Sequence, residues 1–146
     1  NSKMTLRRAM FLILLLGMLG TGAELILLNH TEDSRQWIPV ILLLLGLLTS
    51  AWHWARPSSS SIRVLKMILF GFVASGFAGM YFHYQGSAEF KLESNPSLRG
   101  WSLFREAIRN QAPPFLGPGA MIYLGLLGLV FTRRHPALGK SKEEGE

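Results

Sequence analysis

Two side chains within the apolar parts of this sequence could exchange a proton. Glu24 is the only ionisable residue well inside an apolar stretch, and His83 lies at the corresponding end of another stretch. A carboxylate is costly in an apolar environment, so Glu24 must be protonated or must contact a partner. His83 is the predicted partner, with Tyr81 or Tyr84 as alternative donors. The pair predicts either a proton, quinol or ion site or a structural contact that fixes helix register, and we favour the structural contact.

The histidines raise the question of a cofactor. The chain has four, which are His30, His53, His83 and His135. Two histidines on facing helices can ligate a haem iron. Two of the four fall beyond the apolar stretches, where a haem would be poorly buried, so we predict no cofactor and keep haem or quinone as an alternative. We also predict no metal site, because the only acidic residues close to a histidine in sequence are Glu32 and Asp33, beside His30.

Composition excludes several classes of function. The chain has no cysteine, which rules out disulfides, thiolate metal sites and iron–sulfur clusters. It contains no nucleotide-binding loop and no nucleophile-elbow motif, so we do not expect an enzyme. The net charge of +6 is split among separate segments rather than gathered in one patch. This distribution predicts contact with anionic lipid headgroups, not with nucleic acid.

The elements that must position these residues are four apolar stretches, at 9–28, 37–54, 67–84 and 115–132. About 20 helical residues cross the hydrocarbon core of a bilayer. The pattern therefore predicts an all-α four-helix transmembrane bundle formed by a single domain, residues 1–136. A polar, disordered cytoplasmic tail follows at 137–146. The first stretch could instead be a cleaved signal peptide, but it is longer than an ordinary signal core, so we expect a retained helix.

Charge predicts the orientation. Of the 15 Lys and Arg residues, ten fall on the side of the two termini and five on the other side. The positive-inside rule then places both termini in the cytoplasm, and we expect a bacterial inner membrane.

The segment 85–114 is predicted to be a long outer loop. Alternation of apolar and polar residues over 89–93 predicts a short strand, and Asn95 followed by Pro96 predicts the start of a helix. Trp101, Phe104 and Ile108 would form the apolar face of this helix, which we expect to lie on the membrane surface as a docking helix.

Small residues recur along the apolar stretches at helical spacing. They predict close helix packing, because small side chains let helix backbones approach in lipid. The predicted packing positions are Gly17, Gly20, Gly71, Ser75, Gly76, Gly79, Gly125 and Gly128. If Leu69 faces lipid instead, its replacement by alanine should matter little.

These features predict a non-catalytic membrane protein, an accessory or structural subunit of a larger membrane complex, with lipids and other membrane subunits as partners. The alternative is a small proton-coupled transporter or a quinol- or haem-binding redox subunit that uses Glu24 and His83.

Overall fold

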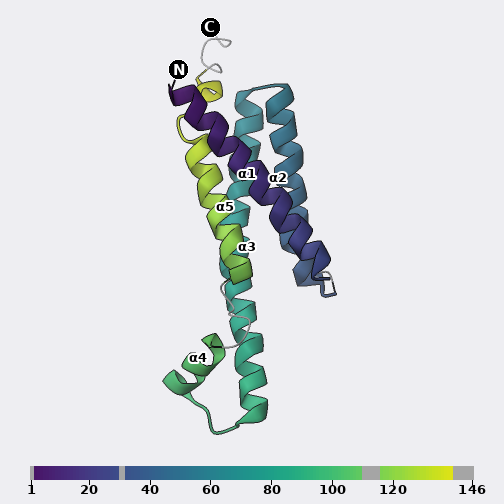
Figure 1. Cartoon of the computed structure of the whole chain (residues 1–146), viewed down its shortest axis with the longest axis vertical. Coiled ribbons are helices and arrows are strands. Elements are labelled where there is room, and N and C mark those ends of the chain that lie inside the picture. Colours follow the sequence, from purple (N-terminus) through teal and green to yellow (C-terminus); the bar gives the residue numbers. More distant parts are fainter. Residues whose placement is uncertain (1, 30–31, 110–115, 140–146) are drawn as a thin grey trace.

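The computed structural model describes residues 2–29, 32–109 and 116–139, and in these ranges it contains helices and no strand (Figure 1). The elements are α1 (Ser2–Leu27), the 3-10 helix η1 (Ser34–Gln36), α2 (Trp37–Ala55), α3 (Ser59–Ser94), α4 (Gly100–Ile108), α5 (Leu116–Thr132) and the 3-10 helix η2 (Pro136–Leu138). The prediction of an all-α fold is confirmed.

Three of the helices are long and apolar enough to cross a membrane. They lie at Leu6–Leu27, Ser34–Ala55 and Ser59–Ser94, whereas α5 is apolar but shorter, at 17 residues. Large apolar side chains also cover the outside of the helices, among them Leu16, Leu44, Leu48, Phe70, Phe77 and Leu126. Soluble monomers rarely expose so many large apolar side chains on contiguous surface. Length and composition together therefore indicate a membrane protein.

Among the four long helices, α1 contacts both α2 and α5, and α3 also contacts both α2 and α5. The side chains that fill the space between them include Leu14, Met18, Leu65, Leu69 and Phe72, all fully buried. The start of α1, the α2–α3 turn and the end of α5 lie together at one end of the molecule (Figure 1). We call this the basic end, because it carries Arg7, Arg8, Arg56, Arg63, Lys66, Arg133 and Arg134.

Local sequence explains the tight turn between α2 and α3. Pro57 follows the end of α2 by two residues, where a proline cannot continue a helix. Ser58 then caps α3, and its hydroxyl accepts a hydrogen bond from the Ser61 backbone N–H at 3.1 Å. The turn brings the last residues of α2 against the first turn of α3.

Helix α3 is much longer than the stretch at 67–84 indicates. Its 36 residues extend about 54 Å at roughly 1.5 Å per residue, well beyond the ~30 Å hydrocarbon core of a bilayer. The strand predicted at 89–93 is wrong, because these residues continue the helix. Extending an existing helix adds one hydrogen bond per residue without a new nucleus, so the weak local alternation is overridden.

Helix α4 folds back beside the far end of α3, and we call this pair the hairpin end (Figure 1). It begins at Gly100, where φ is +53°, rather than at Asn95, which caps the end of α3. Ala107 is fully buried, and the Phe104 ring lies 5.7 Å from that of Tyr84 on α3. The apolar face predicted to lie on a membrane surface is thus partly covered by α3.

The chain after α5 packs into the basic end. Ala137, within η2, is buried, and Leu138 packs against the core. Residues 137–139, predicted to start a disordered tail, are therefore ordered, because an Ala-Leu pair supplies apolar surface to bury. Residues 140–146 lie outside the described ranges.

Candidate functional site

A cluster of buried and half-buried polar residues occupies the basic end, where four segments of the chain meet. The cluster consists of Arg7 from α1, His53 from the end of α2, Ser61 from the start of α3, and His135 from the segment after α5. Two further buried polar residues are close to the cluster in sequence: Ser50 on α2 and Thr132 at the end of α5. We call the first four residues the basic-end cluster.

His53 is fixed by the first turn of α3. Its Nδ1 lies 2.8 Å from the Ser61 hydroxyl, and that hydroxyl donates to the Ser58 carbonyl at 2.9 Å. A serine hydroxyl has one proton, so His53 must carry its own hydrogen on Nδ1 for both hydrogen bonds to form. The side chain is buried and lies edge-on to the Phe11 and Phe131 rings, at 6.4 and 6.2 Å.

In His135, unlike His53, the Nδ1 atom is a hydrogen-bond acceptor. Its Nδ1 accepts a hydrogen bond from the Ala137 backbone N–H at 3.2 Å, which places the ring hydrogen of the neutral form on Nε2. The pKa of His135 is lowered to about 4, chiefly by burial and also by the nearby His53 and Arg7. The ring is therefore neutral at physiological pH.

The two imidazole rings touch. Their centroids are 4.9 Å apart with the ring planes at 80°, and the Phe131 ring lies 5.2 Å from that of His135. This contact leaves no room for a porphyrin between the two histidines, so they do not fit the axial ligands of one haem. No group of three or more metal-binding side chains occurs in the part of the chain that the structure describes.

Arg7 joins α1 to the end of α5. Its guanidinium donates to the carbonyl oxygens of Phe131, Arg133 and Arg134, at 3.0, 3.3 and 3.1 Å. The last carbonyls of a helix have no partner within the helix, and a cation there also interacts favourably with the helix dipole. The cluster thus links α1, α2, α3 and the end of α5 through side-chain hydrogen bonds and ring contacts.

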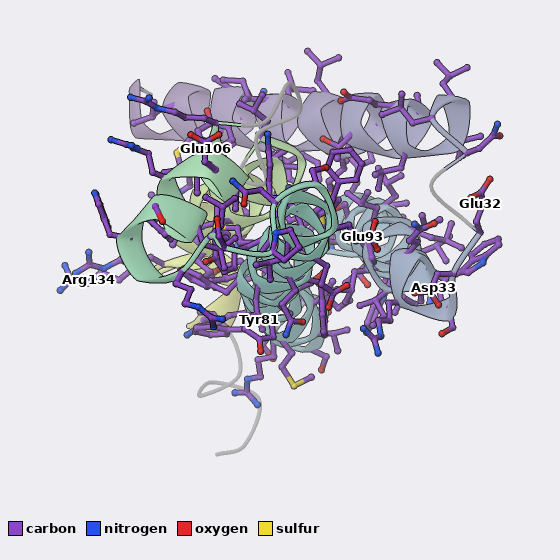
Figure 2. The ribbon with its side chains drawn as sticks, turned by 90° about the horizontal axis from the view of Figure 1, so that it is seen from below. Glu32, Asp33, Tyr81, Glu93, Glu106 and Arg134 are labelled. Atoms are coloured by element: carbon purple, nitrogen blue, oxygen red, sulfur yellow. The ribbon has the colours of Figure 1, made fainter. Side chains whose placement is uncertain are left out.

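The predicted Glu24–His83 pair lies toward the other end of the helices. Glu24 is exposed in the last turns of α1, and His83 is exposed on α3. Their pairing stays a prediction. His30 lies outside the described residues, whereas Glu32 and Asp33 are exposed around η1. Seen from the hairpin end, Glu32 and Asp33 lie at the opposite side of the view from Arg134 (Figure 2).

Most of the predicted packing glycines lie where two helices approach closely. A Cβ added at Gly125 would lie 2.9 Å from the Leu69 carbonyl oxygen, and one at Gly76 would lie 2.7 Å from that of Pro118. Added Cβ atoms would also contact side chains at Gly17, Gly71, Gly79 and Gly128, whereas Gly20 has nothing within 4 Å. Ser75 is half-buried. Leu69 is fully buried against α5, so it does not face lipid, and its replacement by alanine should not be neutral.

The docking residues divide between two environments. Phe104 and Ile108 are half-buried, whereas Trp101 is 72% exposed and stacks on Phe104 at 5.2 Å.

The basic-end cluster was not predicted from the sequence. A signal was present, because Gly46, Thr49 and His53 are spaced on one face of α2 and all three are buried.

The chain matches no protein-family model, and no curated protein or solved structure is significantly similar to it.

Proposed function

We propose that this chain is a four-helix transmembrane bundle of a bacterial inner membrane, with both termini in the cytoplasm, and that it acts as a non-catalytic accessory subunit of a larger membrane complex. The observation that carries the proposal is the α3–α4 hairpin. Helix α3 continues ten residues past the predicted span at 67–84, and α4 packs against this extension. A helical pair that projects from the bilayer offers a preformed surface to a partner.

The exposed aromatic residues of the hairpin support this role. Trp101 and Phe90 are both largely exposed on the projecting elements, outside the stretch that lipid would cover. Aromatic side chains dominate the binding energy of protein interfaces, and a rigid scaffold lowers the entropy lost on binding. The basic-end cluster fits the same role, since it joins helices and offers no paired acid and base.

Native purification with cross-linking and mass spectrometry tests the proposal. We expect a stoichiometric membrane partner that cross-links to the hairpin, and we expect Trp101→Ala with Phe90→Ala to abolish its recovery. Trp54→Ala with Phe77→Ala is the matched control, because both residues are exposed on helices predicted to face lipid. Equal recovery of the partner with both double variants would contradict docking through the hairpin.

The alternative function, a proton-coupled transporter or a quinol- or haem-binding redox subunit, uses Glu24 and His83. It is supported by the position of a carboxylate within α1 and a histidine on α3. A Soret band in the purified protein would favour the redox form. Glu24→Gln retains the shape of the side chain but cannot release a proton, so a folded variant that fails to complement a deletion would favour transport.

A further inference from the structure

A groove at the basic end lies between α1 and α5. It is lined by Leu6, Arg7 and Met10 from α1 and by Val130 and Phe131 from α5, and its volume is about 200 Å³. Leu6 and Val130 are largely exposed, so the groove opens to the outside of the helices rather than toward the core. Four of its five lining side chains are apolar. Its size suits a segment of one hydrocarbon chain lying along the helices.

The cationic side of the groove is fixed in place. Arg7 lines it, and three of the five guanidinium N–H donors are used by the carbonyls of Phe131, Arg133 and Arg134. Two N–H donors therefore remain for another acceptor. The side chains of Arg133 and Arg134 follow directly after α5 and are exposed, as is that of Arg8.

Among the described residues, the charges around the groove are all positive. In the described part of the chain, every Asp and Glu lies at residues 24–33 or 89–106, away from the segments that form the basic end. Arginine is the side chain best suited to phosphate, because its planar guanidinium presents several donors to phosphate oxygens. Basic pockets between membrane helices are sites for anionic lipid headgroups.

We propose that the α1–α5 groove binds an anionic phospholipid, with an acyl chain along Leu6, Met10 and Val130 and the phosphate against Arg7, Arg133 and Arg134. An apolar groove that ends in a cluster of cationic side chains fits an amphiphile rather than a free anion. The inference rests on the transmembrane part of the proposed function but not on the docking of a partner, so it can be tested on the purified protein alone.

The test measures binding of phosphatidylglycerol and of phosphatidylcholine to the full chain in detergent, by native mass spectrometry. We expect the parent protein to retain phosphatidylglycerol preferentially. Arg133→Gln with Arg134→Gln should weaken phosphatidylglycerol binding about tenfold or more, because each basic residue beside an anionic headgroup contributes about fivefold. Arg56→Gln with Arg63→Gln is the matched control: it removes the same charge from the same end, away from the groove, and should change binding less than about twofold.

A second variant separates the groove from simple charge attraction. Val130→Trp fills the apolar part and leaves every arginine in place, so it should also reduce phosphatidylglycerol retention, with unchanged elution on size exclusion as evidence of folding. Equal losses in the two arginine double variants would overturn the proposal, as would unaltered binding in Val130→Trp. Stabilisation of the parent protein by inorganic phosphate to the same degree as by phosphatidylglycerol would also overturn it, because a free anion does not need the apolar groove.

Discussion

Individual polar residues at the basic end are buried or half-buried, and hydrogen bonds from the neighbouring chain offset the cost of removing them from water. Ser61 takes part in the cap of α3 and in a hydrogen bond with His53, and Arg7 donates hydrogen bonds to three carbonyls at the end of α5. A buried polar group that is not hydrogen-bonded lowers the stability of the fold. The basic-end cluster therefore specifies how four segments meet, because a different register would leave these groups without partners.

His135 predicts a pH dependence of stability. Its pKa is about 4 in the folded protein against an ordinary value of 6.5, so between these pH values the unfolded chain binds more protons. Stability should be full above about pH 6.5 and should fall as the pH drops toward 4. His53 from α2 and Arg7 from α1 face the ring and oppose its protonation. Thermal unfolding in detergent at pH 7.5 and 5.0 measures the slope.

His135→Asn is the matched variant for this measurement. Asparagine can still accept a hydrogen bond as a cap but does not titrate, so the loss of stability between pH 7.5 and 5.0 should be smaller. An unchanged slope in this variant would show that other groups cause the acid sensitivity.

Ser50 and Ser61 should respond in opposite ways to replacement by alanine. Ser50 is fully buried, and its hydroxyl has no hydrogen-bond partner among the described residues, so Ser50→Ala should be neutral or stabilise the fold by about 1 kcal/mol. Ser61→Ala removes the partner of His53 and should cost about 1–3 kcal/mol. The melting temperatures of both variants check this contrast. Destabilisation by Ser50→Ala as large as that by Ser61→Ala would mean that the Ser50 hydroxyl is bonded.

At the level of elements, α3 makes the most extensive contacts, because it packs against α2, α5 and, at the hairpin end, α4. Its contact with α5 is close because glycines on each helix face side chains of the other, Gly76 toward Ile122 and Gly125 toward Val73. Helices in lipid associate by packing rather than by the hydrophobic effect, so this approach matters more than the area buried.

Gly125→Ala and Gly20→Ala form a matched pair. The added Cβ at Gly125 would meet backbone atoms of α3, at 2.9 Å from the Leu69 oxygen and 3.1 Å from the Val73 nitrogen, so the helices must separate. We expect a loss of about 1–3 kcal/mol, seen as a lower melting temperature. Gly20 has open space around it and should tolerate alanine without loss. Equal melting temperatures for the two variants would contradict a close α3–α5 contact.

The continuity of α3 predicts a distance. Spin labels on cysteines introduced at Phe77 and Glu93, both exposed, should lie about 24 Å apart, the rise of 16 helical residues. A helix that ended near residue 84 and continued as extended chain would place them roughly 40 Å apart. The chain has no cysteine of its own, so electron paramagnetic resonance on the double variant distinguishes the two. A distance near the longer value would contradict the extended helix.

At the scale of the whole molecule, charge is divided between the two ends. In the described chain the basic end carries arginines and a lysine but no acidic residue, whereas the acidic residues lie at residues 24–33 and 89–106. The positive-inside rule predicts that such a molecule inserts with its basic end in the cytoplasm.

Labelling of single cysteines measures the orientation. Ser60 and Ser94 are exposed at opposite ends of α3. A membrane-impermeant maleimide should label Ser94→Cys in intact cells and should label Ser60→Cys only after permeabilisation. Labelling of Ser60→Cys from outside, with Ser94→Cys protected, would reverse the topology.

The sequence by itself determined the class of element and the composition of its surface. Runs of 18 to 20 apolar residues must be helical in a membrane, because only a helix satisfies every backbone group within one segment, and this reasoning identified the helices around Leu14, Leu43 and Leu124. The packing of one helix on another was decided by tertiary structure. The side of α3 that carries Leu69 faces α5, and this cannot be read from a segment that is apolar on every side.

The same limit applies to the basic-end cluster. His53, Ser61, His135 and Arg7 are spread over nearly the whole chain, and the spacing of small and polar residues before His53 does not show which segments it meets. Their meeting depends on the order in which the helices pack and on the capped turn at Ser58. Local pattern also failed at 89–93, because a helix already formed in α3 and covered by α4 extends through residues whose own alternation favours a strand. Contacts between distant segments fixed both features, and no local propensity encodes such contacts.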